Sequence, residues 1–537
     1  MRDVMLLPLT RSGLVRCAMA FLAVFLLFST SASPVQAQVT AFKQAVAEAA
    51  SRDKDIAAFY QATNYKAIWT TNNSSRRNAL LNALADAPSH GLPTYDVDAL
   101  KAKMKAARNP RDRGLVEVEL SRVFLDYSTS LQTGVLVPAK VISEIKRQVP
   151  YRERVSYLTN FAKSNPGGFF RALRPKSPEY GRLMKEKIRL ERQMGAGGWG
   201  AAVAAKSLKP GDQGNAVLSL RNRLISMGYL NRSNAVSYDG NIQKAVQQFQ
   251  ISHGLNPDGV AGPSTIEQLN IPPEERLKSV LVAMERERWM NMDKGQRHIL
   301  VNLTDFTAKI VENDQVTFET RSVIGARDAD RRTPEFSDEM ETLVINPTWN
   351  VPRSITVKEY LPMLKRNRNA ASHLRIVDRN GRTVPRSAIN FSAYSNKSFP
   401  YSMKQPPSDG NALGLVKFLF PNRYNIYLHD TPTKHLFARE VRAYSHGCIR
   451  LADPFDFAYA LLAKQEKDPV GFFQARLKSG RETPVALEKH VPVHIIYRTA
   501  FVPNKGRANY RDDIYGRDRA IWNALAKAGV ELRAVRG

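Results

Sequence analysis

The sequence predicts a multi-domain α+β protein, in which a helical region and a small three-helix module precede a strand-rich domain that carries an insertion. Two observations predict this class. The chain has 537 residues, and because a domain typically takes about 100–200 residues, we expect three or four domains. The hydrophobic pattern changes from helical spacing to alternation at about Ile299, which indicates that helices give way to strands. A hydrophobic content of 43% is ample for buried cores.

The charge and the cysteine content restrict the classes of partner and scaffold. The formal net charge is +29, which suits nucleic acid, an anionic membrane face or an acidic polymer, and composition alone does not choose among them. Two cysteines are too few for a disulfide-rich scaffold or a four-cysteine zinc site.

The N-terminal segment 1–37 is typical of a secretory signal peptide. Basic residues precede the apolar run 17–28, which is shorter than the about 20 residues that a spanning helix needs. Val35 and Ala37 form a small-x-small cleavage pattern; an uncleaved membrane anchor is the alternative. We therefore expect a periplasmic protein, which argues against nucleic acid as a partner. Cys17 would leave with the signal, so Cys448 would be the single thiol of the mature chain, and catalysis is the first role to test for it.

Residues 40–195 are expected to form a helical domain without motifs for chemistry. Apolar residues recur there at helical spacing with few breakers, and Gly195-Ala-Gly-Gly-Trp-Gly200 is typical of a linker. The predicted helices cover 41–50, 77–85, 97–107 and 115–131.

Residues 208–271 have the pattern of a compact unit of three helices. The ordered elements Gly-x-x-Gly, Leu-x-x-x-Gly-Tyr-Leu, Ala-Val-x-x-Phe-Gln and Gly-Leu-x-x-Asp-Gly-x-x-Gly-x-x-Thr resemble the peptidoglycan-binding domain family over the whole unit. The resemblance implies that this unit binds the glycan wall. Since it holds five basic and four acidic residues, we expect shape and hydrogen bonding, more than charge, to provide that binding. No single residue of the unit can be assigned to a ligand.

Residues 297–502 are expected to form the strand-rich domain, followed by a helical tail at 503–537. The interruption at 352–410 starts with a helical stretch at 357–365 and continues with polar sequence, so it is predicted to be an inserted lid or subdomain. A helix is expected to begin at Asp453-Pro454, and a final helix at 518–525. Predicted strands cover 299–303, 306–310, 316–318, 342–345, 417–420, 425–429 and 493–497.

The candidate chemistry lies in Ile426-Tyr-Leu-His-Asp430 and Tyr444-Ser-His-Gly-Cys-Ile-Arg450. A cysteine nucleophile reacts as the thiolate, so we expect a positive neighbour to lower the pKa of Cys448 from about 8.5 into the range of about 3.5–7.5. His429 has the acid–base chemistry for that role and for protonating a leaving amine. Strand alternation puts Tyr427 on the same face as His429.

Two neighbours of the thiol have predicted roles in the chemistry. Gly447 lacks a Cβ, so it allows substrate to approach and leaves backbone N–H groups free for an oxyanion. Arg450 adds a fixed positive charge that lowers the pKa of the thiol or binds a substrate carboxylate.

Ser445-His-Gly-Cys-Ile-Arg450, with His429 nineteen residues before the cysteine, resembles the catalytic signature of the L,D-transpeptidase family. The similarity extends to 346–352, 413–422 and 427–432, and with the two preceding regions the chain resembles the large periplasmic members that have a scaffold domain. The resemblance implies that Cys448 is the nucleophile, that His429 accepts and donates protons, and that the loop 445–450 shapes the oxyanion site. It also implies that the backbone carbonyl of Asp430 orients the imidazole and that 352–410 is a capping subdomain.

The remaining candidate residues have plainer interpretations beside the functional ones. His446 is expected to be structural or to support the site, since residues two apart on a tight loop rarely face each other. Ser445 belongs to the loop, Tyr427 is a packing residue or a substrate contact, and His435 and His253 are interpreted as ordinary residues.

The first functional hypothesis is an L,D-transpeptidase that makes 3→3 peptidoglycan crosslinks through a thioester. Its partners would be a tetrapeptide donor stem and the diaminopimelate amine of an acceptor stem, it would need no cofactor or metal, and carbapenems would inhibit it covalently. The basic charge then fits a general affinity for the carboxylate-bearing wall. The family also includes members that attach a lipoprotein to the wall or that trim or exchange the terminal D-residue, and the sequence does not separate these outcomes.

Two alternatives remain open. The first is a zinc-dependent wall peptidase that uses His429, His435, His446 and Cys448 as ligands, although the chain has no His-Glu-x-x-His motif beside them. The second is a non-catalytic scaffold that binds peptidoglycan through 208–271.

Overall fold

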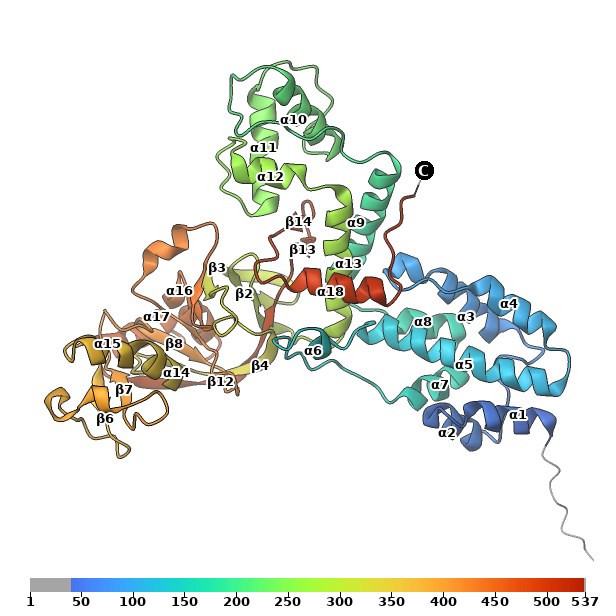
Figure 1. The fold of residues 1–537 in the computed structure, drawn as a ribbon, viewed down its shortest axis with the longest axis horizontal. Helices are drawn as coiled ribbons and strands as arrows, with labels where there is room; N and C mark the ends of the chain where they lie inside the picture. The colour runs from blue at the N-terminus through green and yellow to red at the C-terminus, as the bar shows by residue number, and fades with distance from the viewer. Residues whose placement is uncertain (1–39, 536–537) are drawn as a thin grey trace, which may run out of the picture.

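The computed structural model describes residues 40–535; the predicted signal peptide at 1–37 lies outside the described residues. Three lobes surround the central helix α13 (Pro273–Trp289), as Figure 1 shows. One lobe is the N-terminal helical region, one is the three-helix unit, and one is the strand-rich domain. Within the described part of the chain, no helix is long and apolar enough to cross a membrane.

The N-terminal lobe is helical, as predicted. Its longest helix starts at Pro110, five residues before the predicted start, because the Asn109 side chain caps it by accepting from the N–H of Asp112. Glu117 of this helix is fully buried and accepts from the backbone N–H groups of Ile68 and Thr70, so one carboxylate fixes the loop after the second helix. The helices are α1 (Ala41–Ala50), α2 (Lys54–Ala62), α3 (Ser75–Ala85), α4 (Val97–Ala106), α5 (Pro110–Thr133), α6 (Pro138–Val141), α7 (Arg154–Lys163), α8 (Pro166–Leu173) and α9 (Pro178–Gly195).

The three predicted helices of the small unit are confirmed. They are α10 (Asn215–Ser226), α11 (Gly240–His253) and α12 (Pro263–Asn270). Asp239 caps α11 through the N–H groups of Asn241 and Ile242, and Pro263 occupies the first turn of α12. Trp199, in the predicted linker, is buried in the same hydrophobic cluster as α10 and α11, so this stretch also packs against the domain it precedes.

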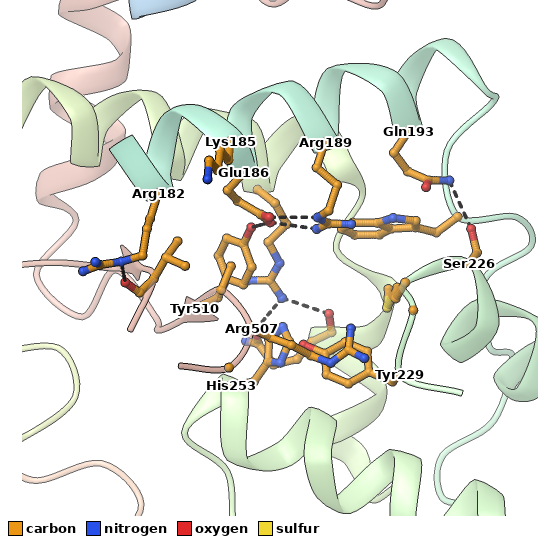
Figure 2. A pocket seen from close by; sticks show the side chains of 18 residues that line it. Arg182, Lys185, Glu186, Arg189, Gln193, Ser226, Tyr229, His253, Arg507 and Tyr510 are labelled. Atoms are coloured by element: carbon orange, nitrogen blue, oxygen red, sulfur yellow. Dashed lines mark hydrogen bonds and ion pairs between the residues drawn. The ribbon is translucent and has the colours of Figure 1, made fainter. Parts of the chain in front are cut away.

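The central helix α13 was not predicted, because its apolar residues do not gather on one face. Leu281 and Met284 are fully buried, and so are the charged residues Glu285 and Arg288 that follow them, which pair at 3.0 Å. A helix buried on every side has no amphipathic pattern. The C-terminal segment packs on helix α13 through β13 (Ala500–Phe501), β14 (Asn509–Tyr510) and α18 (Arg517–Lys527). We call α13 and the elements packed on it the hub. A cavity of about 530 Å³ lies where this segment, α9 and the three-helix unit meet (Figure 2).

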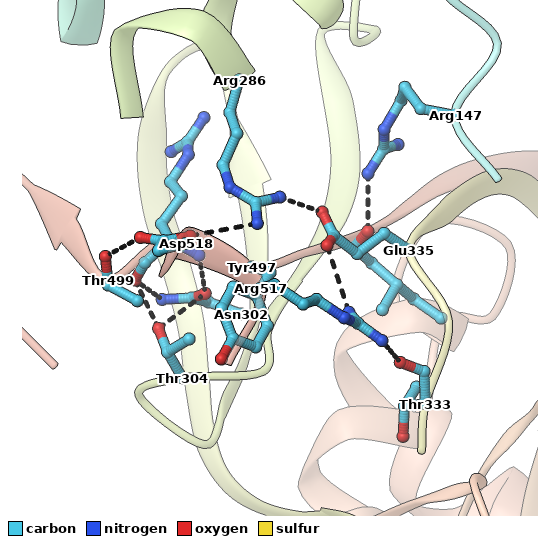
Figure 3. A network of polar contacts seen from close by, with 12 residues as sticks. Arg147, Arg286, Asn302, Thr304, Thr333, Glu335, Tyr497, Thr499, Arg517 and Asp518 are labelled. Carbon is cyan, nitrogen blue, oxygen red and sulfur yellow. Dashed lines mark hydrogen bonds and ion pairs between the residues drawn. The ribbon is translucent and has the colours of Figure 1, made fainter. Parts of the chain in front are cut away.

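A buried network of charged residues joins the hub to the strand-rich domain (Figure 3). Glu335 accepts from Arg286 of α13 at 2.5 Å and from Arg517 of α18 at 3.1 Å. Arg286 also pairs with Asp518 at 3.1 Å, and Arg517 donates to the backbone carbonyl of Thr333 at 2.9 Å. The predicted helical tail is therefore part of the core that connects the lobes.

The strand-rich domain is a nine-stranded sheet in the order β10-β3-β11-β9-β8-β4-β12-β1-β2, and a further pairing of β2 with β3 closes eight of the strands into a barrel. Helices α16 (Pro454–Leu462) and α17 (Pro469–Lys478) pack against it. The strands are β1 (Arg297–Asn302), β2 (Thr307–Glu312), β3 (Gln315–Gly325), β4 (Phe336–Ile345), β8 (Val416–Leu419), β9 (Leu428–His429), β10 (Ala443–Ser445), β11 (Ile449–Leu451) and β12 (Thr483–Ile496).

Several predicted strands differ in extent from those of the structure; the strands predicted at 316–318 and 342–345, for example, are the longer β3 and β4. The strand predicted at 425–429 is limited to β9, because Asn425 has φ +53° and the Asn422 side chain holds the preceding turn by bonding both the N–H and the carbonyl of Ile426. The strand predicted at 493–497 is the end of the long strand β12. The first half of β12 was not predicted, because its residues are mostly polar and do not show a hydrophobic alternation.

The insertion has a core of its own. Trp349, Leu361, Ile376 and Met403 belong to a hydrophobic cluster distinct from that of the barrel. The predicted helical start is present as α14 (Arg353–Ile355), the π-helical turn Thr356–Tyr360 and α15 (Leu361–Arg366). A three-stranded sheet completes it, in the order β5 (Trp349–Asn350), β7 (Ser402–Gln405) and β6 (Arg375–Val377).

Candidate active site

The adjacent strands β9 and β11 bring the predicted catalytic residues together. They pair in parallel, with Leu428 opposite Ile449 and His429 opposite Arg450. Leu428 and Ile449 are fully buried in the barrel core, so alternation places Tyr427, His429, Cys448 and Arg450 on the other face. The Tyr427 and His429 rings lie 5.6 Å apart between centroids.

The thiol of Cys448 lies half-buried in this group. It donates to the backbone carbonyl of Asn425, with 3.4 Å between sulfur and oxygen. The Tyr427 side chain and the Arg450 guanidinium both act to lower the pKa of the thiol. Arg450 donates to the Thr433 hydroxyl at 2.9 Å, which directs its side chain.

The imidazole of His429 is held by the backbone that follows it. Nδ1 donates to the backbone carbonyl of Asp430. The Asp430 carboxylate is buried and accepts from the N–H groups of Leu415 (2.9 Å) and Thr431 (2.7 Å) and from Lys434 (2.5 Å). Its side chain therefore fixes the turn, while its carbonyl orients the histidine.

The loop before Cys448 is held by the Ser445 side chain. Its hydroxyl oxygen accepts from the N–H of Gly447 at 3.1 Å and donates to the carbonyl of Cys448. Gly447 has φ +113°, in the left-handed region, and a Cβ there would lie 3.1 Å from Ile426. The N–H of Gly447 itself is therefore engaged by Ser445. In the part of the chain that the structure describes, the N–H of Cys448 has no hydrogen-bond partner, and it is the better oxyanion donor.

Thr333 supports this loop, and the sequence did not reveal it. Its fully buried hydroxyl donates to the carbonyl of Gly447 at 2.7 Å and accepts from the N–H of Gly325 at 2.9 Å. Because Thr333 lies more than a hundred positions from the cysteine, only the fold brings the two together. Asn425, whose carbonyl accepts from the thiol, was also missed, since a backbone acceptor leaves no signal in the sequence.

The protonation states of the pair differ from the expectation. Burial raises the pKa of Cys448 to about 11, although hydrogen bonds from Tyr427 and the charge of Arg450 oppose that rise. Burial and the charge of Arg450 lower the pKa of His429 to about 3. A thiol pKa within about 3.5–7.5 was therefore a wrong expectation for the unliganded site. The resting site holds a neutral thiol beside a neutral imidazole, which can take the proton as the thiol attacks.

This protonation state predicts the pH dependence of alkylation. The rate at which iodoacetamide modifies Cys448 is expected to rise about tenfold per pH unit from pH 7 to 9, because the thiolate fraction does so below the pKa. Peptide mass mapping of the modified cysteine over time measures this rate. A rate that is already maximal and flat below pH 7 would contradict a neutral resting pair.

His446 points away from the thiol toward the insertion. Its Nε2 lies 2.6 Å from Glu359 in the π-helical turn, and Glu359 also pairs with Arg331 at 3.2 Å. A second exposed pair, Lys358 with Asp330, joins the same two segments at 2.9 Å. The His446 contact ties the insertion to the loop that carries the nucleophile, and the other two pairs tie it to residues 330–331.

The ligand set of the zinc alternative is not assembled. His435 is exposed on the turn Lys434–Ala438, whereas His429 is buried and bonded to Asp430. Across residues 40–535, no group of three or more His, Cys, Asp or Glu side chains lies close enough to hold a metal ion. His253 stacks on Phe249 inside the three-helix unit at 3.8 Å between ring centroids.

Three family models match consecutive parts of the chain. Residues 54–186 match the "Scaffold domain", residues 213–269 the "Putative peptidoglycan binding domain" and residues 296–485 the "L,D-transpeptidase catalytic domain". The "Putative L,D-transpeptidase" of Haemophilus influenzae is 32% identical over 246 residues, which are 45% of this chain and 48% of that protein. The chain thus spans about half the length of this curated relative.

Solved structures add little to this comparison. The L,D-transpeptidase of Xylanimonas cellulosilytica (residues 123–326) is 14% identical, with a TM-score of 0.17, over 55% of this chain and 98% of that one. The L,D-transpeptidase of Stackebrandtia nassauensis is 16% identical, with a TM-score of 0.22, over 55% and 97%. Such low scores support no argument, so the assignment depends on the family models and on the curated relative. Residues 296–485 of this chain thus match the L,D-transpeptidase catalytic domain, and they follow segments that match a scaffold domain and a peptidoglycan-binding domain.

Proposed function

We propose that the protein is an L,D-transpeptidase that forms 3→3 crosslinks in peptidoglycan, with Cys448 as nucleophile and His429 as general base and acid. The observation that carries the proposal is the placement of both side chains on one face of β9 and β11, with Nδ1 of His429 held by the Asp430 carbonyl. A histidine oriented by a third group beside a thiol is the arrangement that nucleophilic catalysis needs.

The acylation step follows from this arrangement. The sulfur of Cys448 attacks the carbonyl carbon of the third residue of a tetrapeptide stem, while the thiol proton moves to Nε2 of His429. The N–H of Cys448 stabilises the oxyanion. When the intermediate collapses, the C–N bond breaks, the imidazolium gives its proton to the departing amine, and D-alanine leaves a thioester on the enzyme.

The second step reverses the proton movements. The diaminopimelate amine of a neighbouring stem attacks the thioester carbon and gives one proton to His429. The C–S bond then breaks, and the sulfur takes this proton back, so that a neutral thiol and a neutral imidazole are restored. Since the thiol and the imidazole handle every proton, these steps call for no cofactor.

The remaining expectations belong to the same proposal. The predicted signal peptide would place the enzyme in the periplasm, associated with the wall and acting in its biogenesis and in cell shape. The insertion would cap the donor stem and move over the site, with the contact of His446 and Glu359 joining it to the catalytic loop. Tyr427 and Arg450 would contact the substrate, and a carbapenem would acylate Cys448.

Product analysis tests the proposed reaction. With purified tetrapeptide muropeptides, chromatography and mass spectrometry should find 3→3 linked dimers and free D-alanine. Iodoacetamide should abolish both products and a chelator should leave them unchanged. Monomers shortened by one residue without dimers would contradict crosslinking and favour a trimming enzyme, and sensitivity to the chelator would favour the zinc alternative.

Thr333 should affect the rate through the loop it supports. Thr333→Val keeps the shape of the side chain but leaves the buried carbonyl of Gly447 without its donor, at a cost of about 1–3 kcal/mol. We expect kcat to fall about tenfold with KM within about twofold, because the nucleophile loses its position but the stem is still bound. Thr333→Ser, which retains the hydroxyl, should restore the rate. Equal rates for the Val and Ser variants would contradict this role.

A further inference from the structure

The cavity at the hub is built from three segments that are far apart in the sequence. Helix α9 contributes Lys185, the three-helix unit and the start of α13 contribute Tyr229 and Arg276, and the C-terminal segment contributes Arg507 and Tyr510. Figure 2 shows Tyr229, Arg507 and Tyr510 between α9 above and the three-helix unit below. A volume of about 530 Å³ lies within the range of about 300–1,000 Å³ that is usual for ligand sites.

Positive charge in this cavity is only partly neutralised. Arg189 is paired with Glu186 at 2.7 Å and Arg182 with Glu179 at 2.9 Å. Lys185, Arg276 and Arg507 also line the cavity, and none of these three has a carboxylate within 4 Å in the part of the chain that the structure describes. The cavity therefore holds three uncompensated cations.

Arg276 is the unusual member, because it is buried. Only 5% of it is exposed, its guanidinium donates to the backbone carbonyl and side chain of Gln268 at 3.0 and 2.8 Å, and it lies 4.8 Å from the centroid of the Tyr510 ring. These neutral partners satisfy part of its hydrogen-bonding capacity but supply no negative charge. Asp512 acts on Arg276 electrostatically but forms no ion pair with it among the described residues. A buried cation without an ion-pair partner is costly, and an anionic ligand would offset that cost.

Trp199 gives an independent indication of a ligand. The indole lines the cavity and is 6% exposed, yet its Nε1–H has no hydrogen-bond partner among the described residues. Buried indole N–H groups nearly always have an acceptor. Tyr229 and Tyr510 add aromatic faces to the same cavity, so a donor, three cations and apolar rings meet there.

We propose that this cavity binds the carboxylate-bearing stem peptide of peptidoglycan, with Lys185, Arg276 and Arg507 facing the carboxylates and Trp199 donating to an oxygen of the ligand. This assignment of the cavity rests on the proposed function, because the choice of a stem peptide as the ligand follows from that function. It also replaces an expectation from the sequence: the three-helix unit by itself is nearly neutral, but in the folded protein α9 and the C-terminal segment supply the charge for wall binding.

Reversing the charge of the two exposed cations of the cavity, Lys185 and Arg507, tests the site without disturbing the core. Lys185→Glu/Arg507→Glu is compared with Lys206→Glu/Lys244→Glu, which makes the same change of charge at exposed residues outside the cavity. Both variants and the wild type, as the full mature chain, are sedimented with purified diaminopimelate-type sacculi. The first variant should bind at least tenfold more weakly than the wild type, and the control less than twofold.

A second arm identifies the chemistry of the ligand. Sacculi whose carboxylates have been converted to amides should bind the wild type as weakly as native sacculi bind Lys185→Glu/Arg507→Glu. Equal binding of the two variants, undiminished binding to amidated sacculi, or no binding of the wild type would each overturn the proposal. Crosslinking of soluble muropeptides is measured in parallel. If the wild type crosslinks but shows no binding that depends on the cavity, only this site fails; if the binding holds without crosslinking, only the proposed function fails.

Discussion

Cys448→Ala is expected to abolish crosslinking, with a loss of at least about 10⁴-fold in the rate of D-alanine release. The reason is that Cys448 is the only cysteine among the described residues, so no other thiol there can form the thioester. The alanine variant should remain folded, because the thiol is half-buried and its one strong contact is with a backbone carbonyl. Chromatographic assay of free D-alanine and of linked dimers measures the loss.

A matched control separates loss of the nucleophile from general damage. His490→Ala removes an exposed side chain of β12, and its activity should stay within about twofold of the wild type because it lies outside the site. If Cys448→Ala still formed dimers, this result would contradict a mechanism in which the cysteine is the nucleophile. Comparable losses in both variants would show that the assay reports unfolding instead of chemistry.

Glu335→Gln is expected to lower the free energy of unfolding by about 3–5 kcal/mol, because it breaks a buried ion pair and leaves charge uncompensated. Glu335 is 3% exposed and faces both Arg286 and Arg517 (Figure 3). The amide keeps the shape of the side chain but not its charge. Asp518, which pairs with Arg286, is left as the nearest anion for the two guanidinium groups.

Urea unfolding followed by fluorescence measures this effect. Asp330→Asn is the matched control, because it removes an ion pair with Lys358 in which both side chains are 59% exposed; we expect it to cost less than about 1 kcal/mol. Since Arg517 also holds the carbonyl of Thr333, Glu335→Gln should slow crosslinking as well. Equal stability losses for the two variants would contradict the importance of the buried network.

The elements that the sequence predicted are those with one buried face. Helix α5 and the helices α10, α11 and α12 have apolar residues on one side and capping residues at their ends, and both signals are local. Helix α13 is buried all around, so periodicity fails there. The strand predicted at 425–429 was too long, because a turn held by the Asn422 side chain precedes the two-residue strand β9.

The candidate site was predictable where its chemistry lies in side chains of one motif. His429, Cys448 and Arg450 stand out by residue type and spacing, and the fold places them on one face. Thr333 could not be predicted, because its effect depends on a contact between distant segments. The same holds for Arg276 and Arg507, which meet only when the C-terminal segment packs on the hub. The pKa of the thiol was predicted wrongly, since burial is a property of the fold.

The most direct measurement is the mass of the protein after reaction with a donor stem or a carbapenem. The wild type incubated with disaccharide tetrapeptide should gain the mass of the donor minus D-alanine, and with a carbapenem the mass of the drug. Peptide mapping should place each adduct on the fragment that contains Cys448. The Cys448→Ala variant should gain neither mass. An adduct on another residue, an adduct that persists in the alanine variant, or no adduct on the wild type would contradict the assignment of Cys448 as the nucleophile.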